Sequence, residues 1–295
     1  MKFDFMKLKW LYFLISALFL VPFCFSLIFW GLKPAIDFTG GSIIEVKSEK
    51  LSVKSDKSKV QEIVKKEGSE LASIQESSEQ TYILRTKEID KNKKEKILEA
   101  IKKEFGEVEE IRFETVGPTI GKELIRKTIM AISIAALFIL FYIAQRFKDK
   151  KYGICAILAM FHDSLILLGS FSILGHFFNV EVDTLFVTAV LTILSFSVHD
   201  TVVVYDRIRE SERLNPKVHF NDLANKAVVE TLTRSLNNSM TIIFMLLCLY
   251  LLGGETIKWF VFALLIGTIS GTYSSTFTAV PLLVLWEEIK EKRIK

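Results

Sequence analysis

The chain has 295 residues, of which 50% are hydrophobic and 24% are charged. A soluble globular protein does not hold both classes in these amounts unless they are separated along the chain. Residues 31–126 contain 19 of the 38 Lys and Arg and 19 of the 34 Asp and Glu, whereas the rest consists mainly of apolar stretches. The composition therefore predicts a membrane protein with one soluble domain. That domain has no net charge, which argues against nucleic acid as a partner.

Six apolar segments are long enough to cross about 30 Å of hydrocarbon as helices with a rise of about 1.5 Å per residue. The first segment stands apart from the other five, and the four tryptophans lie at the ends of the first and last segments, where the headgroup region is expected. A cleaved signal peptide is a weaker interpretation of the N-terminus, because the run from Trp10 to Leu32 is too long and lacks a small-residue cleavage site. The predicted spans are residues 10–32, 127–145, 153–175, 184–205, 232–252 and 259–286.

Basic residues are distributed unevenly between the short connections. Segment 146–151 carries four Lys or Arg and the connection after the fourth span carries five, whereas residues 176–183 carry none and residues 253–258 carry one. The positive-inside rule places the basic connections in the cytoplasm. We therefore expect residues 1–32 to begin in the cytoplasm and form helix 1, residues 33–126 to lie outside, residues 127–286 to form a five-helix bundle, and residues 287–295 to form a cytoplasmic tail.

The soluble domain shows alternating strand and helix patterns. The predicted order βαββαβ is typical of a small α+β ferredoxin-like domain. The fold class is thus a polytopic α-helical membrane protein with six transmembrane helices, one plus five, and this domain between helices 1 and 2. The strands are expected at 42–48, 71–77, 80–86 and 108–115, and the helices at 56–67 and 90–105.

Enzymatic interpretations of the sequence are weak. The run 117–123 has three residues between its glycines and a glutamate after its lysine, so it does not match a phosphate-binding loop. His162-Asp163 and His199-Asp200 lie in spans, but neither belongs to an HExxH pattern. Adjacent helical residues point about 100° apart, so we do not expect His199 and Asp200 to form a catalytic pair. The sequence predicts no enzyme, cofactor or metal site.

Asp200 is the clearest ionisable residue inside the predicted membrane region. A carboxylate in hydrocarbon costs about 2.5 to 3.5 kcal/mol on insertion scales, so such a residue is usually paired, hydrated or functional. Asp200 is either a titrating group or a permanently ionised residue that fixes helix packing. Arg234, at the start of the fifth span, is either its basic partner or a side chain that reaches to the headgroups.

Four further polar residues in or beside the spans are candidates for a secondary relay. Asp163 and His162 lie in the third span, where hydrogen bonds from Ser or Thr are the alternative explanation. His199 precedes Asp200, and Asp206 follows it by six residues near the cytoplasmic end of the fourth span.

Small residues form two further patterns. Along the last span they recur every four residues, which allows close approach of another helix, and we expect Gly267, Gly271 and Ser275 to serve helix packing. Glycine and proline also mark the connectors at either end of the soluble domain. These connectors are expected to form turns or hinges and include Gly40, Gly41, Gly117, Pro118 and Gly121.

Three motifs carry a resemblance to a known family. They are DFTGG at 37–41, VGPTIGKEL at 116–124 and HDTVVVYDRIRE at 199–210. With these motifs the chain resembles SecF proteins of the SecD/SecF family, in the RND superfamily, over essentially its whole length. The resemblance implies a bacterial inner-membrane subunit that works with SecD beside the SecY-E-G channel, and it adds YajC and exported unfolded preproteins as partners.

The resemblance also implies a mechanism. The proton motive force would help to pull exported chains outward, with Asp200 as the proton-responsive acid and Arg234 as its basic partner. Two other functions stay open at this point. A passive scaffold for SecD or the channel needs no titrating acid, and a small-molecule exporter of the RND type needs a second half with its own outer domain.

Overall fold

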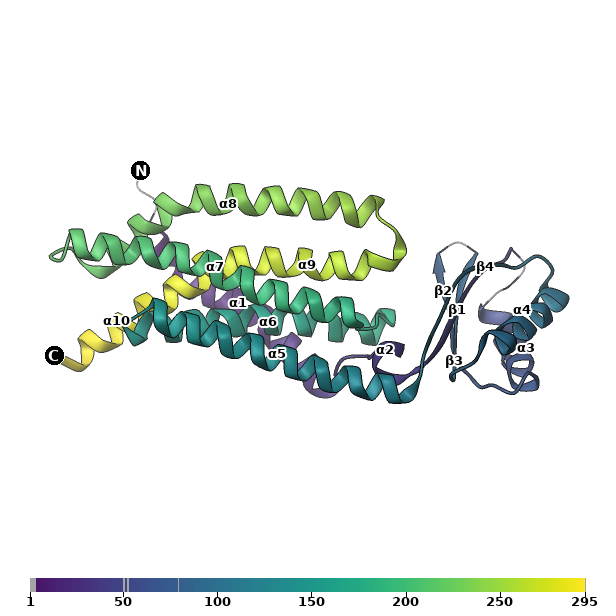
Figure 1. The fold of residues 1–295 in the computed structure, drawn as a ribbon. Helices are drawn as coiled ribbons and strands as arrows, with labels where there is room; N and C mark the ends of the chain where they lie inside the picture. The colour runs from purple at the N-terminus through teal and green to yellow at the C-terminus, as the bar shows by residue number, and fades with distance from the viewer. Residues whose placement is uncertain (1–3, 50, 52, 79, 295) are drawn as a thin grey trace. The chain divides into compact units, whose positions relative to one another are not determined.

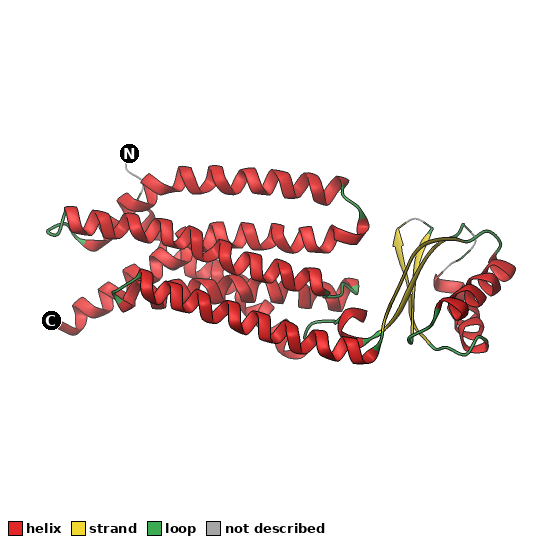
Figure 2. Ribbon diagram, viewed as in Figure 1, coloured by secondary structure: helices red, strands yellow, loops and turns green. Residues whose placement is uncertain are grey.

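The computed structural model describes residues 4–49, 51, 53–78 and 80–294. It divides into two compact units, one formed by Met1–Lys33 with Met130–Lys295 and one by Pro34–Ile129. The first unit consists of helices, and the second consists of a four-stranded sheet with helices (Figures 1 and 2).

Within the described residues, six helical segments are long and apolar enough to cross a membrane. Short turns separate the later ones, and several helices begin at a capping side chain, such as Asp183, which accepts a hydrogen bond from the amide of Phe186. The elements are a 3-10 helix η1 (Phe5–Leu8), α1 (Lys9–Phe29), α5 (Pro118–Arg146), α6 (Lys150–Phe178), α7 (Thr184–Leu214), α8 (Phe220–Leu252), α9 (Glu255–Ser274), a π-helical turn η2 (Ser275–Ala279) and α10 (Val280–Ile294). Helices α5, α6, α7 and α8 extend past the predicted apolar spans because their charged ends are also good helix formers, whereas α1 ends three residues before its predicted span does.

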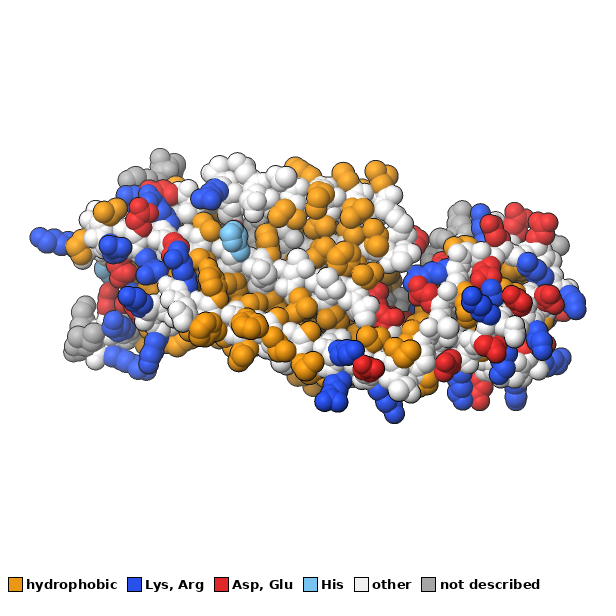
Figure 3. Space-filling view, viewed as in Figure 1, with side chains coloured by type: hydrophobic (Ala, Val, Ile, Leu, Met, Phe, Trp, Pro, Cys, Tyr) orange, Lys and Arg blue, Asp and Glu red, His pale blue; other side chains and the backbone are white. Residues whose placement is uncertain are grey.

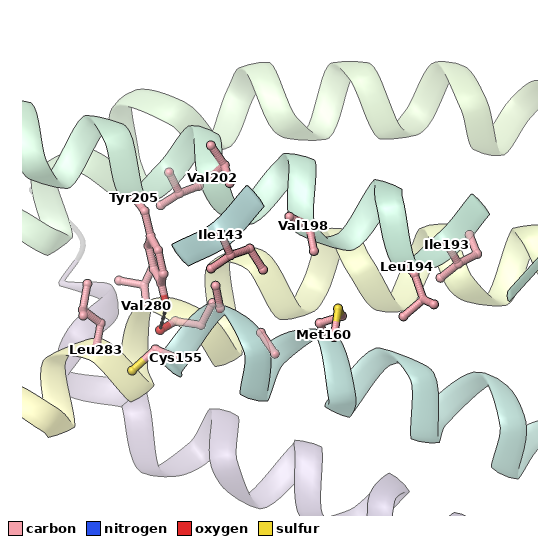
Figure 4. Close-up of a cluster of buried hydrophobic side chains, with 14 of the residues drawn as sticks. Ile143, Cys155, Met160, Ile193, Leu194, Val198, Val202, Tyr205, Val280 and Leu283 are labelled. Atoms are coloured by element: carbon pink, nitrogen blue, oxygen red, sulfur yellow. Dashed lines mark hydrogen bonds between the residues drawn. The ribbon is translucent and has the colours of Figure 1, made fainter. Parts of the chain in front are cut away.

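Helix α7 is the centre of the helical unit, since it packs against α6, α8, α9 and η2. Its apolar side chains meet those of α6 and α10 in a continuous buried cluster (Figure 4). Helix α1 packs on α6, where the Ser26 hydroxyl donates to Ser172 at 2.6 Å. The labelled core residues include Ile143, Cys155, Met160, Leu194, Val198, Tyr205 and Leu283.

Charged side chains gather at the end of the helical unit that holds both η1 and α10 (Figures 1 and 3). The buried ammonium of Lys151 lies 2.7 Å from Glu287 and 3.4 Å from Glu212. Lys9 pairs with Glu288, so the first and last helices are joined at this end. The basic connections identified in the sequence are therefore at one end of the unit.

The second unit contains strands β1 (Gly41–Lys47), β2 (Leu71–Ser78), β3 (Thr81–Thr86) and β4 (Glu109–Val116), with helices α2 (Ile36–Thr39), α3 (Val53–Lys66) and α4 (Lys91–Phe105). The sheet order is β2-β3-β1-β4, and all neighbouring strands are antiparallel. Alternate residues of β1, such as Ile44 and Val46, are fully buried with Val60, Ile97 and Ile101 from α3 and α4. The strands and helices occur in the predicted order.

The glycine-containing connectors differ from the prediction. Gly40 and Gly41 have φ of +74° and +125°, which disfavours any side chain. Pro118 and Gly121, however, are not in a separate connector but in the first turns of α5, since proline is well tolerated at a helix start. A Cβ on Gly121 would lie 2.9 Å from the Phe38 carbonyl oxygen, so this glycine permits close packing of the 36–40 segment on α5.

Candidate functional site

Asp200 is buried between α7, α8 and η2, with 5% of its surface exposed. Its Oδ2 accepts hydrogen bonds from Ser235 of α8 at 2.5 Å and from Ser275 of η2 at 3.0 Å. No hydrogen bond to Oδ1 and no ion pair of Asp200 is present among the described residues. Oδ2 thus has two serine donors, and Oδ1 has none from the side chains that the structure describes.

Asp163 on α6 has a different environment, with 1% of its surface exposed. Its Oδ1 contacts Ser270 at 2.7 Å and the Nδ1 of His162 at 3.0 Å, and its Oδ2 accepts from Ser197 at 2.6 Å and Ser274 at 2.5 Å. Both oxygens therefore have two polar partners. Because the serines come from α7 and α9, this carboxylate ties three helices together.

His162 and Asp163 show that adjacent helical residues can still contact each other. Adjacent helical residues start about 100° apart, yet these two side chains bend toward each other within hydrogen-bond distance. His199 and Asp200 follow the expectation, since His199 is exposed while Asp200 is buried. The Nε2 of His162 is buried and has no hydrogen-bond partner in the described structure.

The two buried carboxylates are connected through consecutive residues of the last helical segment. Ser274 donates to Asp163 and Ser275 donates to Asp200. The π-helical turn begins at Ser275, and at its other end the carbonyl of Ala279 accepts a hydrogen bond of 2.8 Å from the fully buried Tyr205 of α7. Local π-helix frequently occurs at functional sites because it redirects side chains and frees backbone groups.

Arg234 does not contact Asp200 in this structure. Its side chain is exposed, and the next residue, Ser235, takes the position beside the carboxylate. The predicted ion pair is therefore absent from this arrangement, because the rotation of α8 about its axis directs position 235 inward. The role of Arg234 stays a prediction.

His199 and Asp206 are not part of the buried network. His199 lines a groove of 640 Å³ between α7 and α8, together with Thr188, Thr192, Ser195 and Asn238. Asp206 lies at the charged end, where it pairs with Arg146 and lies 3.4 Å from Arg209. The structure therefore separates these two residues from the predicted relay.

The small-residue pattern on α9 lies against α7. A Cβ on Gly267 would lie 2.3 Å from Ile193, and one on Gly271 would lie 3.2 Å from Phe196. Ser275 is fully buried where η2 packs on α7, and its hydroxyl also donates to Asp200. The glycines allow α9 to approach α7 closely enough for this hydrogen bond.

The sequence interpretation allowed for Ser or Thr hydrogen bonds to Asp163 and His162, but it did not identify which serines bind the two carboxylates. Ser197 precedes Asp200 by one helical turn, and Ser270 and Ser274 lie four residues apart on one helix face. Hydroxyls at such spacings in apolar segments indicate interhelical hydrogen bonds, but the sequence does not show which acceptor each one binds. Among the described residues, no group of three or more His, Cys, Asp or Glu side chains is arranged to hold a metal ion.

Comparisons with known proteins agree with the resemblance carried by the DFTGG, VGPTIGKEL and HDTVVVYDRIRE motifs. The family model for the protein export membrane protein SecD/SecF C-terminal region matches residues 94–289, and the SecD/SecF GG motif matches residues 25–50. A protein translocase subunit SecF from Thermobaculum terrenum is 43% identical, with 96% of this chain and 94% of the relative covered. One from Anaerolinea thermophila is 40% identical, with 95% of this chain and 92% of the relative covered.

A solved structure shows the same fold. SecDF from Thermus thermophilus, described as a translocon-associated membrane protein, matches with a TM-score of 0.85 and 30% identity over 98% of this chain. The chain spans 39% of the length of that protein. With the family model covering most of the sequence and SecF relatives covering nearly all of it, the chain belongs to the SecD/SecF family as a SecF-type protein translocase subunit.

Proposed function

We propose that this SecF-type subunit uses the proton motive force to assist protein translocation and that Asp200 carries the proton. The observation that supports this role is a buried carboxylate with one oxygen lacking a donor and no basic partner among the described residues. Burial in such a place costs an ionised carboxylate much more solvation free energy than it costs the protonated, neutral carboxyl group. One charge that crosses 100 mV releases about 2.3 kcal/mol, which is enough to shift a two-state helix arrangement.

Asp163 is proposed to serve structure rather than proton transfer. All four of its polar contacts are made, and three come from serine hydroxyls, which donate to a carboxylate. A proton added there would displace one of these donors and loosen the contact between α6, α7 and α9. A proton on Oδ1 of Asp200 would displace neither serine, because both serines donate to Oδ2.

Arg234 is proposed to reach Asp200 in a second arrangement of α8. Ser235 already donates to Asp200, so α8 passes the carboxylate at this level. Residues 234 and 235 differ by about 100° around the helix axis, so rotation of α8 exchanges the serine hydroxyl for the guanidinium. Both the serine hydroxyl and the guanidinium stabilise the ionised carboxylate, so protonation of Asp200 weakens either contact and lets α8 shift between the two arrangements.

Partners and location follow from the same proposal. Association with SecD and the Sec translocon in general is supported by the SecF relatives and by the SecDF structure. We propose that SecD is the partner within the membrane, that the SecY-E-G channel supplies the path for exported unfolded preproteins, and that YajC is a further partner. The charged end with both termini would face the cytoplasm of a bacterial inner membrane.

The second unit is proposed to be a ferredoxin-like domain outside the membrane. Its βαββαβ order and its antiparallel β2-β3-β1-β4 sheet support that classification. Because it lies outside the membrane in this proposal, it is the part that we propose contacts an emerging chain.

The substitution Asp200→Asn tests the proposal, because it fixes a neutral side chain of nearly the same size. We expect normal assembly with SecD but loss of gradient-dependent completion of preprotein translocation into inverted membrane vesicles, with ATP-driven initiation unchanged. His199→Asn is the matched control, since this neighbour is exposed outside the carboxylate network, and it should retain gradient dependence. Wild-type gradient dependence in Asp200→Asn would favour a passive scaffold, and failure to purify with SecD would favour the exporter interpretation.

A further inference from the structure

The Ser275 hydroxyl has two acceptors within reach. It lies 3.0 Å from Oδ2 of Asp200 and 3.1 Å from the backbone carbonyl of Thr272 on its own helix. A hydroxyl carries one hydrogen, so it donates to one acceptor at a time. Ser235, by contrast, has Asp200 as its hydrogen-bond acceptor at 2.5 Å. Of the two serines on Asp200, Ser275 is therefore the one with an alternative.

The choice between these acceptors depends on the charge of Asp200. An ionised carboxylate only accepts hydrogen bonds, and bonds to it are roughly twice as strong as bonds between neutral groups. Once the carboxyl is protonated, this advantage over the Thr272 carbonyl disappears. The hydroxyl of Ser275 then returns to the backbone of α9.

Ser275 also begins the π-helical turn that joins α9 to α10. The turn is bound to α7 at both ends, through Asp200 at Ser275 and through Tyr205 at Ala279. Release of the first bond leaves the one at Ala279 as the remaining described hydrogen bond between this turn and α7, so a change at Asp200 acts directly on the turn.

We propose that Ser275 is a positioning residue that stabilises ionised Asp200 and releases it on protonation. This inference rests on the proposed function of Asp200. The other charged or titratable groups on the elements packed against α7 do not replace Ser275. Arg234 is exposed, His162 binds Asp163, and the Tyr273 hydroxyl donates to the Tyr12 carbonyl. On α7 itself, His199 is exposed and Tyr205 binds Ala279.

The experiment is an infrared pH titration of the full chain in complex with SecD, reconstituted in lipid. The carboxyl C=O band of Asp200 is identified by its absence in Asp200→Asn. In Ser275→Ala the pH of half-protonation should rise by about one to two units, because a donor to the charged form is lost. Ser270→Ala is the matched control, since it removes a donor to Asp163 instead, and it should leave the Asp200 midpoint unchanged.

A second pair of variants separates the hydroxyl from side-chain shape. Ser275→Thr and Ser275→Val have the same shape, and only the first keeps the hydroxyl, so the midpoint of the threonine variant should stay near wild type and that of the valine variant should rise. This pair decides the matter even if Ser275→Ala fails to assemble. Equal midpoints in the two variants, with Asp200 still titrating, would refute the role of Ser275 and leave the proposed function of Asp200 standing. Absence of a titrating Asp200 band in the wild type would instead refute the proposed function, and this inference with it.

Discussion

Asp163 and Asp200 lie on neighbouring helices of one bundle but have different hydrogen-bond environments. Asp163 has partners on both oxygens, whereas Asp200 has donors on Oδ2 only. When every oxygen of a buried carboxylate accepts hydrogen bonds, adding a proton breaks at least one of them. When one oxygen has no donor, a proton can bind there without breaking a hydrogen bond. This difference supports the structural role that we propose for Asp163 and the proton-carrying role that we propose for Asp200.

At the residue scale we predict that Asp163→Asn destabilises the helical unit. The amide nitrogen of asparagine is a donor and would face serine hydroxyls that now donate to the carboxylate, so at least one group loses its partner, at about 1 to 3 kcal/mol. The measurement is the thermal denaturation midpoint in detergent. Asp200→Asn is the comparison, with a smaller decrease expected because its Oδ1 has no donor to lose. Equal decreases would contradict the assignment.

At the scale of elements, the glycines of α9 and the π-helical turn after it determine which side chains reach the carboxylates. Gly267 and Gly271 let α9 lie against α7, and this proximity brings Ser270 and Ser274 to Asp163. The π turn then changes the helical phase immediately after Ser274. Consecutive serines can thus serve carboxylates on two different helices.

We predict that Gly267→Ala lowers the denaturation midpoint although alanine is the better helix former. The added Cβ would lie 2.3 Å from Ile193, and overpacking of about 1 to 3 kcal/mol exceeds the gain in helix propensity of about 1 kcal/mol. Gly153→Ala is the matched control, because this glycine also lies inside a helix and its added Cβ would make an ordinary contact, 3.7 Å from Ile143. A midpoint for Gly267→Ala at or above that of the control would show that the α7–α9 contact accommodates the added methyl group without loss of stability.

At the scale of the whole molecule, the charge distribution supports one orientation in the membrane. The helical unit has its basic connections, η1 and α10 at one end. Loops rich in Lys and Arg stay in the cytoplasm, while a long domain crosses regardless of its charge. The proposed orientation therefore places 34–129 on the outer side.

Cysteine labelling tests this orientation. In a background without Cys24, Cys155 and Cys248, we expect Glu107→Cys to react with a membrane-impermeant thiol reagent in intact cells, because this side chain is exposed in the second unit. Lys150→Cys, exposed at the start of α6, should react only after the cells are opened. The opposite labelling pattern would reverse the proposed topology.

The sequence by itself determined the elements of the protein. Hydropathy over about 20 residues and the helical and strand periods are local properties, so the existence of the six long helices and the order of the strands and the two longer helices in 34–129 were predicted, although the charged ends of α5, α7 and α8 were missed. Asp200 and Asp163 were also found from sequence, because an acid inside an apolar segment is conspicuous without any structure. Membrane orientation and the coupling role of Asp200 stay predictions.

Only the tertiary structure decided which residues meet. Whether Arg234 or Ser235 faces Asp200 depends on the rotation of α8 about its axis, and a rotation of about 100° changes the answer without changing hydropathy. The pairing of Ser274 with Asp163 and of Ser275 with Asp200 depends on a π-helical turn and on the close approach at Gly267. These features arise from packing between segments far apart in the chain, and local sequence patterns carry no information about the angle at which two helices pack.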